Sequence, residues 1–264
     1  IFLRTHADFN SMRRVGSFNP STDKRPAVIV QCNSVDDVAK SVNFARDNEL
    51  ELAIKSGGHD ILGQSTCEGG IMIDTSLMQN LELDSQKRTL RVGAGVRVGS
   101  VEYHLSETGL ALPLTCHPGV GISGCTLGGG LGWLLGKYGT TADSVTKMNV
   151  VSADGRIIQA TENQNEDLFW ALRGGGGNFG IVTEFEYEVH PQDDVIGGFI
   201  VYPIDALGEY LQFYREVMAT APDELMIEIS TAPTNPPLLV TTVCYSGTLK
   251  ESKAILAPIR SFGK

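Results

Sequence analysis

The pattern of apolar and polar positions near the start of the chain predicts a βαβ unit. Residues 27–31 (AVIVQ) form a short apolar run that is typical of a buried strand. Ser34 then stands where a helix N-cap is expected, and apolar side chains recur at helical spacing through residues 35–42. The helix should end near Asn48, and the next apolar run, residues 52–54, predicts a second strand.

The same patterns predict further elements up to about residue 190. They are a strand at 71–74, a hairpin around 84–87, a helix at 98–108, a strand, turn and strand within 148–158, a helix at 166–173 and a strand at 181–189. In the helix at 166–173, Trp170 is expected to belong to the core because it lies at helical spacing from other apolar residues. Asp143 is expected to fix its own loop.

Residues 191–194 are the best candidate for a domain boundary, which divides the chain into domains 1–191 and 192–264. Beyond the boundary we expect a strand at 199–202, a helix at 205–220, strands at 225–229 and 238–244, and a helix starting near Lys250. This order predicts an α+β layer. The chain stops inside a helical pattern, so we expect this second domain to be the N-terminal part of a longer one.

One long segment, residues 113–139, combines many glycines with apolar side chains. It holds nine glycines, including the run 128–130, and also Leu127, Leu131 and Trp133. Flexible linkers of such glycine content are filled with polar residues instead. Backbone packed closely against a ligand explains both features.

Composition narrows the classes of function. The formal net charge is −10 and the isoelectric point is near 5.0, which argues against nucleic acids and anionic membrane surfaces as partners. No apolar run approaches the ~20 residues that span a bilayer. The five cysteines are odd in number and scattered, so neither a disulfide framework nor a metal site is expected. We expect a small organic substrate and favour a cytoplasmic location, with secretion as the alternative if a signal peptide was removed upstream of Ile1.

Three glycine-rich segments carry the candidate chemistry. Ser56-Gly57-Gly58-His59-Asp60 follows a predicted strand, and glycine amides at a strand end can bind a pyrophosphate. This segment matches neither GxGxxG nor GxxxxGK[ST], so neither a Rossmann site nor a P-loop is supported at the end of this strand. The other two segments are residues 120–132 (VGISGCTLGGGLG) and 167–183 (DLFWALRGGGGNFGIVT).

Together these segments resemble the vanillyl-alcohol oxidase/p-cresol methylhydroxylase (PCMH-type) flavoprotein family, in its berberine-bridge-enzyme-like and 6-hydroxy-D-nicotine-oxidase-like branch. The resemblance covers roughly residues 20–191 and rests on three ordered signatures. It implies an α+β protein with a PCMH-type FAD-binding domain of two α/β subdomains, followed by a substrate domain whose sheet covers the isoalloxazine.

The resemblance also assigns the cofactor-binding residues. His59 matches the histidine that bonds covalently to the flavin C8 methyl group, and the alternative is a histidine that merely caps its loop. The remaining residues expected to bind FAD are Ser56, Gly57, Gly58, Asp60 and Gly63 in the pyrophosphate loop, His117, Val120, Gly121, Ser123 and Gly124 along the flavin, and Gly180, Ile181 and Val182 at the adenine end.

Some relatives carry a second tether, a cysteine bonded to flavin C6. Counting back from Gly124 places His117 at that position, with Cys116 one residue earlier. A one-residue shift turns a side chain to the other side of an extended segment. We therefore expect a single attachment, with His117 at the flavin edge and double tethering through Cys116 as the alternative.

By resemblance, the chain belongs to an FAD-dependent oxidase that transfers a hydride from a CH–OH or CH–NH carbon to the flavin, with dioxygen as acceptor. The catalytic base is expected in the substrate domain, where Tyr202, Glu228 and Tyr245 lie on predicted strands. The alternatives are a flavoprotein that sequesters a small molecule without turnover and a fragment that binds FAD but lacks the base. The substrate itself and the oligomeric state are not determined by the sequence.

Overall fold

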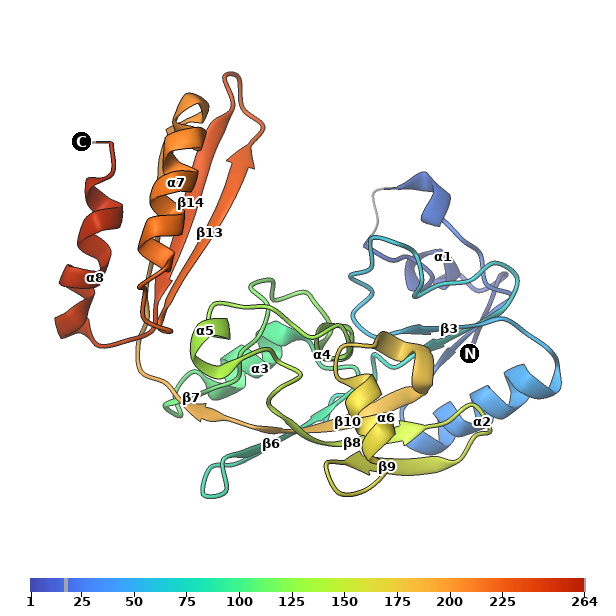
Figure 1. The fold of residues 1–264 in the computed structure, drawn as a ribbon. Helices are drawn as coiled ribbons and strands as arrows, with labels where there is room; N and C mark the ends of the chain where they lie inside the picture. The colour runs from blue at the N-terminus through green and yellow to red at the C-terminus, as the bar shows by residue number, and fades with distance from the viewer. Residues whose placement is uncertain (17–18, 264) are drawn as a thin grey trace. The chain divides into compact units, whose positions relative to one another are not determined.

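A computed structural model describes residues 1–16 and 19–263. The chain divides into two compact units. The first holds Ile1–Gly132 and Thr140–His190, and the second holds Trp133–Gly139 and the chain from Pro191 onward. Within the described residues the strands form a four-stranded and a five-stranded sheet in the first unit and a three-stranded sheet in the second, and β7 and β11 form a further two-stranded sheet. The predicted α+β class is confirmed (Figure 1).

The four-stranded sheet contains the predicted βαβ unit. Its strands are ordered β1-β2-β4-β3, with β2, β3 and β4 parallel, and they span Phe2–Leu3 (β1), Val28–Gln31 (β2), Leu52–Lys55 (β3) and Ile71–Asp74 (β4). Helix α2 (Val35–Asp47) connects β2 to β3. It begins with a capping box, because the Ser34 side chain accepts from the Asp37 amide and the Asp37 carboxylate accepts from the Ser34 amide.

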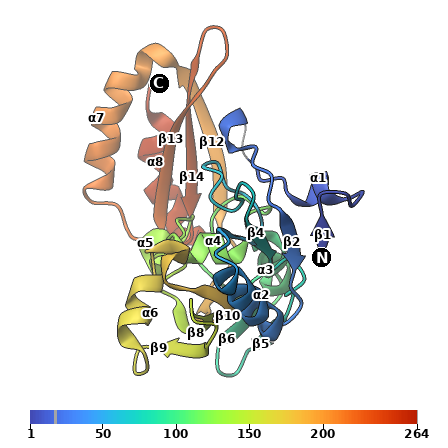
Figure 2. The same cartoon turned by 90° about the vertical axis from the view of Figure 1, so that its right-hand side faces the viewer.

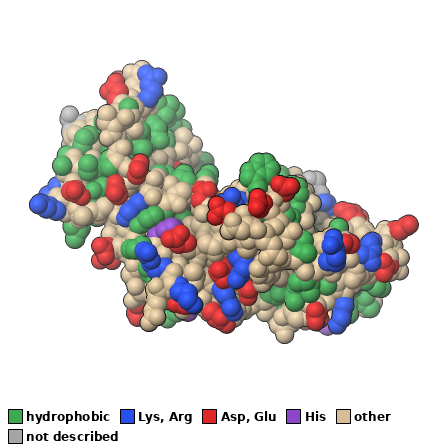
Figure 3. Space-filling model, turned by 60° about the horizontal axis from the view of Figure 1, so that its bottom comes forward, with side chains coloured by type: hydrophobic (Ala, Val, Ile, Leu, Met, Phe, Trp, Pro, Cys, Tyr) green, Lys and Arg blue, Asp and Glu red, His purple; other side chains and the backbone are tan. Residues whose placement is uncertain are grey.

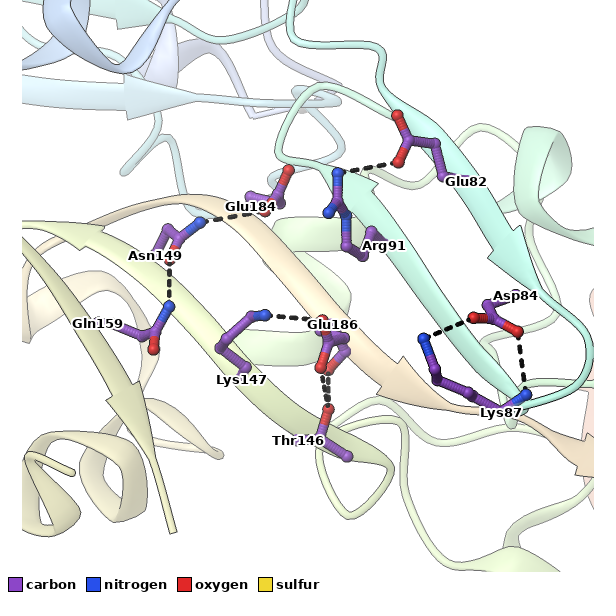
Figure 4. A network of polar contacts seen from close by, with 10 residues as sticks. All are labelled: Glu82, Asp84, Lys87, Arg91, Thr146, Lys147, Asn149, Gln159, Glu184 and Glu186. Atoms are coloured by element: carbon purple, nitrogen blue, oxygen red, sulfur yellow. Dashed lines mark hydrogen bonds and ion pairs between the residues drawn. The ribbon is translucent and has the colours of Figure 1, made fainter. Parts of the chain in front are cut away.

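The five-stranded sheet is antiparallel and has one buried and one solvated face. Its order is β5-β6-β10-β8-β9, and its strands span Leu81–Asp84 (β5), Thr89–Gly93 (β6), Ile181–Glu188 (β10), Val145–Val151 (β8) and Ile157–Thr161 (β9). Phe185 and Tyr187 point into the core, whereas Glu184 and Glu186 lie among polar partners on the other face (Figure 4). This alternation is the signature of a half-buried strand, and it confirms the strand predicted at 181–189.

Short helices and strands complete the first unit. They are α1 (Phe9–Met12), η1 (Pro20–Thr22), α3 (Val98–Leu105), β7 (Leu110–Ala111), α4 (Ile122–Leu127), α6 (Glu166–Leu172), η2 (Gly176–Phe179) and β11 (His190–Pro191), which ends in the second unit. The largest apolar cluster joins the buried face of the five-stranded sheet to α3, α4 and α6. A second cluster places Val38 and Val42 of α2 between Ile73 of the first sheet and the adjoining ends of β8 and β10.

Two features of the first unit differ from expectation. Helix α4 was not predicted, because glycines disfavour helices and the segment around it is rich in them. Trp170 is 76% exposed and not part of the core. Only one side of this short helix is buried, and Phe169 and Leu172 lie on that side.

The loop at Asp143 agrees with expectation. The Asp143 carboxylate fixes this loop, since it accepts from the Thr140 amide and hydroxyl, each at 2.8 Å.

The second unit is a sheet with helices on one face (Figure 2). Its strands β12 (Ile196–Pro203), β14 (Leu238–Tyr245) and β13 (Leu225–Ala232) are antiparallel in that order. Helices α7 (Leu207–Met218) and α8 (Leu249–Ser261) pack on the face that carries Ile227, Val243 and Tyr245. The short elements η3 (Ile204–Ala206) and α5 (Leu135–Tyr138) also belong to this unit.

The surface carries charges of both signs. Figure 3 shows acidic and basic side chains interspersed over the face that it presents, without a broad basic field. None of the described helices is both long and apolar enough to cross a membrane.

Candidate functional site

The first unit contains one large cavity, of about 810 Å³, which is bounded by all three glycine-rich segments. Loops after β3 and β4, the start of α4, and the η2–β10 connection form its walls. The residues that line it include Ser56, Gly57, Gly58, His59, Asp60, Thr75, Val120, Gly121, Ser123, Gly124, Cys125, Asn178, Gly180, Ile181 and Val182. The fold therefore brings together residues that lie far apart in the sequence.

The first two glycine-rich segments pack directly on each other. A Cβ built on Gly57 would overlap the backbone of Gly121, lying 2.6 Å from its Cα, and a Cβ on Gly121 would lie 2.7 Å from the Ser56 hydroxyl. Ser56 and Ser123 both donate to the Ala94 carbonyl, at 2.6 and 2.7 Å. These two hydroxyls thus tie the loops to the same point, and the glycines allow the backbones to approach.

The packed loops leave amide donors and open space toward the cavity. Over the described residues, the amides of Gly57, Gly58 and His59 donate no hydrogen bond within the chain. A Cβ built on Gly124 would meet nothing within 4 Å. None of the described residues that line the cavity is Lys or Arg. An anionic group bound here would therefore be held by backbone amides and not by cationic side chains.

Asp60 supports its own loop. Its carboxylate accepts from the Leu62 and Gly63 amides at 2.9 and 3.2 Å, and from the Ser65 amide and hydroxyl at 2.6 and 2.7 Å. Burial acts to raise the pKa of Asp60, but the Ser65 and loop-amide hydrogen bonds outweigh it, so this pKa lies below its ordinary value. The Asp60 carboxylate therefore fixes the form of its own loop.

Gly180 and Gly63 both have positive φ angles, but only Gly180 is among the described residues that line the cavity. Gly63 has φ +69°, and a Cβ built on it would lie 2.5 Å from the Thr22 Cβ. Gly180 has φ +146°, and a Cβ there would lie 2.7 Å from Val150 Cγ1. Gly180 thereby delivers the buried residues Ile181 and Val182 to the cavity wall. Both positions favour glycine for conformational reasons as well as for space.

The ring of His59, which lines the cavity, contacts the ring of His117, which is not among the described lining residues. Both side chains are exposed, and their ring centroids lie 4.6 Å apart with an interplanar angle of 48°. His117 Nδ1 accepts a hydrogen bond from the Gly119 amide at 3.1 Å. Cys116 is an exposed free thiol. His117, and not its neighbour Cys116, is therefore the residue for which the structure gives a contact with His59.

The three candidate bases of the second unit lie on different faces of its sheet. Tyr202 donates to the Ile259 carbonyl at 3.4 Å and contacts the rings of Tyr210 and Phe262 among the helices. Tyr245 is 3% exposed and belongs to the core beneath α8. Glu228 is exposed and pairs in register with Thr242, on the face opposite the helices.

The sequence did not single out several residues around the cavity. Thr75, Cys125 and Asn178 line it. Thr75 directly follows β4, and neighbouring parallel strands end at the same edge, so the predicted βαβ unit contained a signal for it. Beneath α4, the Thr126 hydroxyl and the Tyr187 hydroxyl are hydrogen-bonded at 2.7 Å. Complete burial raises the pKa of Tyr187 well above its ordinary value, against the effect of the Thr126 bond.

Comparison with known proteins identifies the family. Residues 26–161 match the family model described as "FAD binding domain". The chain belongs to this family. The FAD prediction is confirmed by this membership, and the matched residues include both packed loops, Ser56–His59 and the segment that carries Gly121.

Individual relatives place this FAD-binding chain in the predicted branch. It is 33% identical to (R)-6-hydroxynicotine oxidase of Paenarthrobacter nicotinovorans over 246 residues, 91% of this chain and 54% of that protein. The crystal structure of 6-hydroxy-D-nicotine oxidase from Arthrobacter nicotinovorans matches with a TM-score of 0.93 and 31% identity, over 100% of this chain and 59% of that one. BBE-like #28 from Arabidopsis thaliana matches with a TM-score of 0.89 and 27% identity, over 97% and 55%. The predicted PCMH-type fold is confirmed, and the chain spans about half the length of the curated relatives it matches.

Proposed function

We propose that this chain is the FAD-binding part of an oxidase that tethers FAD covalently through His59. The oxidase would remove a hydride from a CH–OH or CH–NH carbon of a small organic substrate, with dioxygen as the final acceptor. The observation that carries the proposal is the cavity whose loop of unpaired amides leads directly into His59. Relatives named as oxidases of 6-hydroxynicotine and of chitooligosaccharides support the general reaction class.

The residues of the cavity fit FAD in charge and shape. The amides of Gly57, Gly58 and His59 would hold the pyrophosphate, because they are the unpaired donors of a loop whose form is fixed by Asp60. Gly124 leaves room for a flat ring against the first turn of α4, and the wall made by Ile181 and Val182 would contact the adenine end. When bound, FAD supplies the two-electron acceptor that passes electrons to dioxygen.

Among the three candidate bases, Glu228 is the one whose side chain is exposed on the sheet face opposite α7 and α8. Tyr245 is buried, and Tyr202 is half-buried on the face that carries α7 and α8, where its hydroxyl donates to the Ile259 carbonyl. The open face of the sheet carries Phe199, Thr242 and Glu228 in one row across its three strands. We therefore assign the proton-accepting role to Glu228. Glu228→Gln should lower the rate of flavin reduction at least 100-fold while FAD binding is retained.

Acid precipitation followed by intact-mass measurement tests the covalent bond. We expect a yellow pellet whose polypeptide is heavier by one FAD, and a colourless pellet for His59→Ala. Cys116→Ser is the matched control, because this thiol is exposed, adjacent to His117 in sequence and expected to make no bond to flavin. A colourless wild-type pellet with FAD in the supernatant would contradict the covalent attachment and leave the fold unaffected.

Anaerobic substrate addition tests the reaction. Candidate alcohols, amines and sugars are mixed with the flavin-loaded protein in the absence of dioxygen. Loss of the yellow absorbance on addition of one of them supports hydride transfer, and admitted air should restore it with formation of hydrogen peroxide. A ligand that shifts the absorbance without bleaching it would favour sequestration over turnover.

A further inference from the structure

His117 lies in a turn that is held rigidly in place. The Val120 amide donates to the His117 carbonyl at 3.1 Å and closes a β-turn with Pro118 and Gly119 at its centre. Three contacts anchor this turn to the start of α3. They are Gly99 N to Pro118 O at 3.0 Å, Val98 N to Val120 O at 2.9 Å, and Arg97 Nη1 to Gly119 O at 3.2 Å.

The imidazole of His117 is also fixed in orientation. Its Nδ1 accepts from the Gly119 amide, so in the neutral ring the proton resides on Nε2. Gly119 leaves space for this ring, since a Cβ there would lie 3.1 Å from His117 Cε1. The hydrogen bond from the Gly119 amide therefore sets the direction in which the ring points.

His59, in contrast, is exposed and its ring makes no hydrogen bond within the described residues. Such a side chain would sample several rotamers. The His117 ring is centred 4.6 Å from the His59 ring. It occupies space on one side of the His59 side chain and so excludes some of its rotamers. A fixed neighbour of this kind raises the fraction of time that a reacting atom spends in the productive position.

We propose that His117 is a positioning residue for covalent attachment of FAD, which orients the His59 imidazole through ring contact. The inference rests on the proposed function of His59. In the attachment, one C–H bond of the flavin C8 methyl group and the N–H bond of the His59 ring are replaced by one C–N bond. The two electrons and two protons that are released pass to dioxygen, which leaves as hydrogen peroxide.

Variants of His117 separate the ring from its hydrogen bond. His117→Phe keeps a flat ring and loses the acceptor, whereas His117→Asn keeps an acceptor for the Gly119 amide and loses the ring. The full chain and its variants are prepared free of flavin, mixed with FAD in air, and quenched with acid at intervals to measure protein-bound flavin. Reversible FAD binding, followed by flavin fluorescence, and the thermal midpoint show that each variant is folded.

We expect attachment in His117→Phe at a rate within about threefold of wild type, and about 10- to 100-fold slower attachment in His117→Asn and His117→Ala. Attachment in His117→Asn as fast as in His117→Phe, or in His117→Phe as slow as in His117→Ala, overturns the inference. Wild-type protein that attaches no flavin, or His59→Ala that still does, overturns the proposed function instead. The two failures are therefore distinguishable.

Discussion

Gly121 and Gly124 stand three residues apart in one motif, yet their surroundings are opposite. Gly121 meets the backbone of Gly57 so closely that no Cβ fits, whereas the position of a Cβ on Gly124 is open toward the cavity. Gly121 is required for the two loops to pack on each other, whereas Gly124 leaves room for a ligand. A glycine-rich motif therefore contains two kinds of constraint, one on folding and one on binding, which substitutions can separate.

Gly57→Ala should have the largest effect. Its Cβ would overlap the Gly121 backbone, which cannot rotate away as a side chain could. We expect a loss of about 3 kcal/mol in the free energy of unfolding, at the upper end for overpacking, measured by urea denaturation without added FAD. The control is Gly208→Ala in α7, where a Cβ meets nothing within 4 Å and a helical alanine should be neutral or stabilising. Equal stability of the two variants would show that the close contact between Gly57 and Gly121 is not needed for folding.

Tyr187→Phe should come next, because it removes one partner of a fully buried hydrogen bond beneath α4. The Thr126 hydroxyl would be left unpaired, at a cost of about 1–3 kcal/mol. Replacing both partners, with Tyr187→Phe and Thr126→Val, should recover part of this loss in a double-mutant cycle of unfolding free energies. Strictly additive losses would show that the two hydroxyls do not act as a pair.

Gly124→Ala should separate binding from folding. Alanine suits a helix better than glycine, so we expect unchanged or higher stability, by at most about 1 kcal/mol. The added methyl group projects into the cavity, and we expect the affinity for FAD to fall about 10-fold, equivalent to about 1.4 kcal/mol. Titration of flavin fluorescence measures it. Undiminished affinity would show that no ligand lies against this turn of α4.

The smallest effect is a dependence of stability on pH through Asp60. Its pKa is lowered in the folded state, so its contribution is present above the pKa of the unfolded carboxyl and is lost as the pH falls through the lower folded value. Asp60→Asn should therefore be less stable than wild type at pH ~7, with a narrower difference near pH ~3. Urea midpoints at both values measure this. A constant difference would assign the loss to geometry and not to charge.

Much of the fold followed from local patterns. The capped helix α2, the parallel strands around it and the alternating strand β10 were all predicted, because propensity, capping and burial agree in each. Helix α4 was missed since its glycines oppose a helix, and contacts made by the tertiary structure outweigh that preference. Trp170 was misplaced because helical spacing shows which residues share a side but not which side is covered.

The sequence by itself determined the α+β class, the three glycine-rich signatures and the expectation of FAD, because these depend on residue types and their order. Only the tertiary structure decided which glycines contact backbone and which face the cavity, that the His59 and His117 rings meet, and that Glu228 lies opposite the helices. Each of these depends on how segments distant in the chain approach one another. Because a glycine has no side chain, the sequence does not show which residues it contacts. The face on which a strand residue lies is defined only once the register of the strand is set.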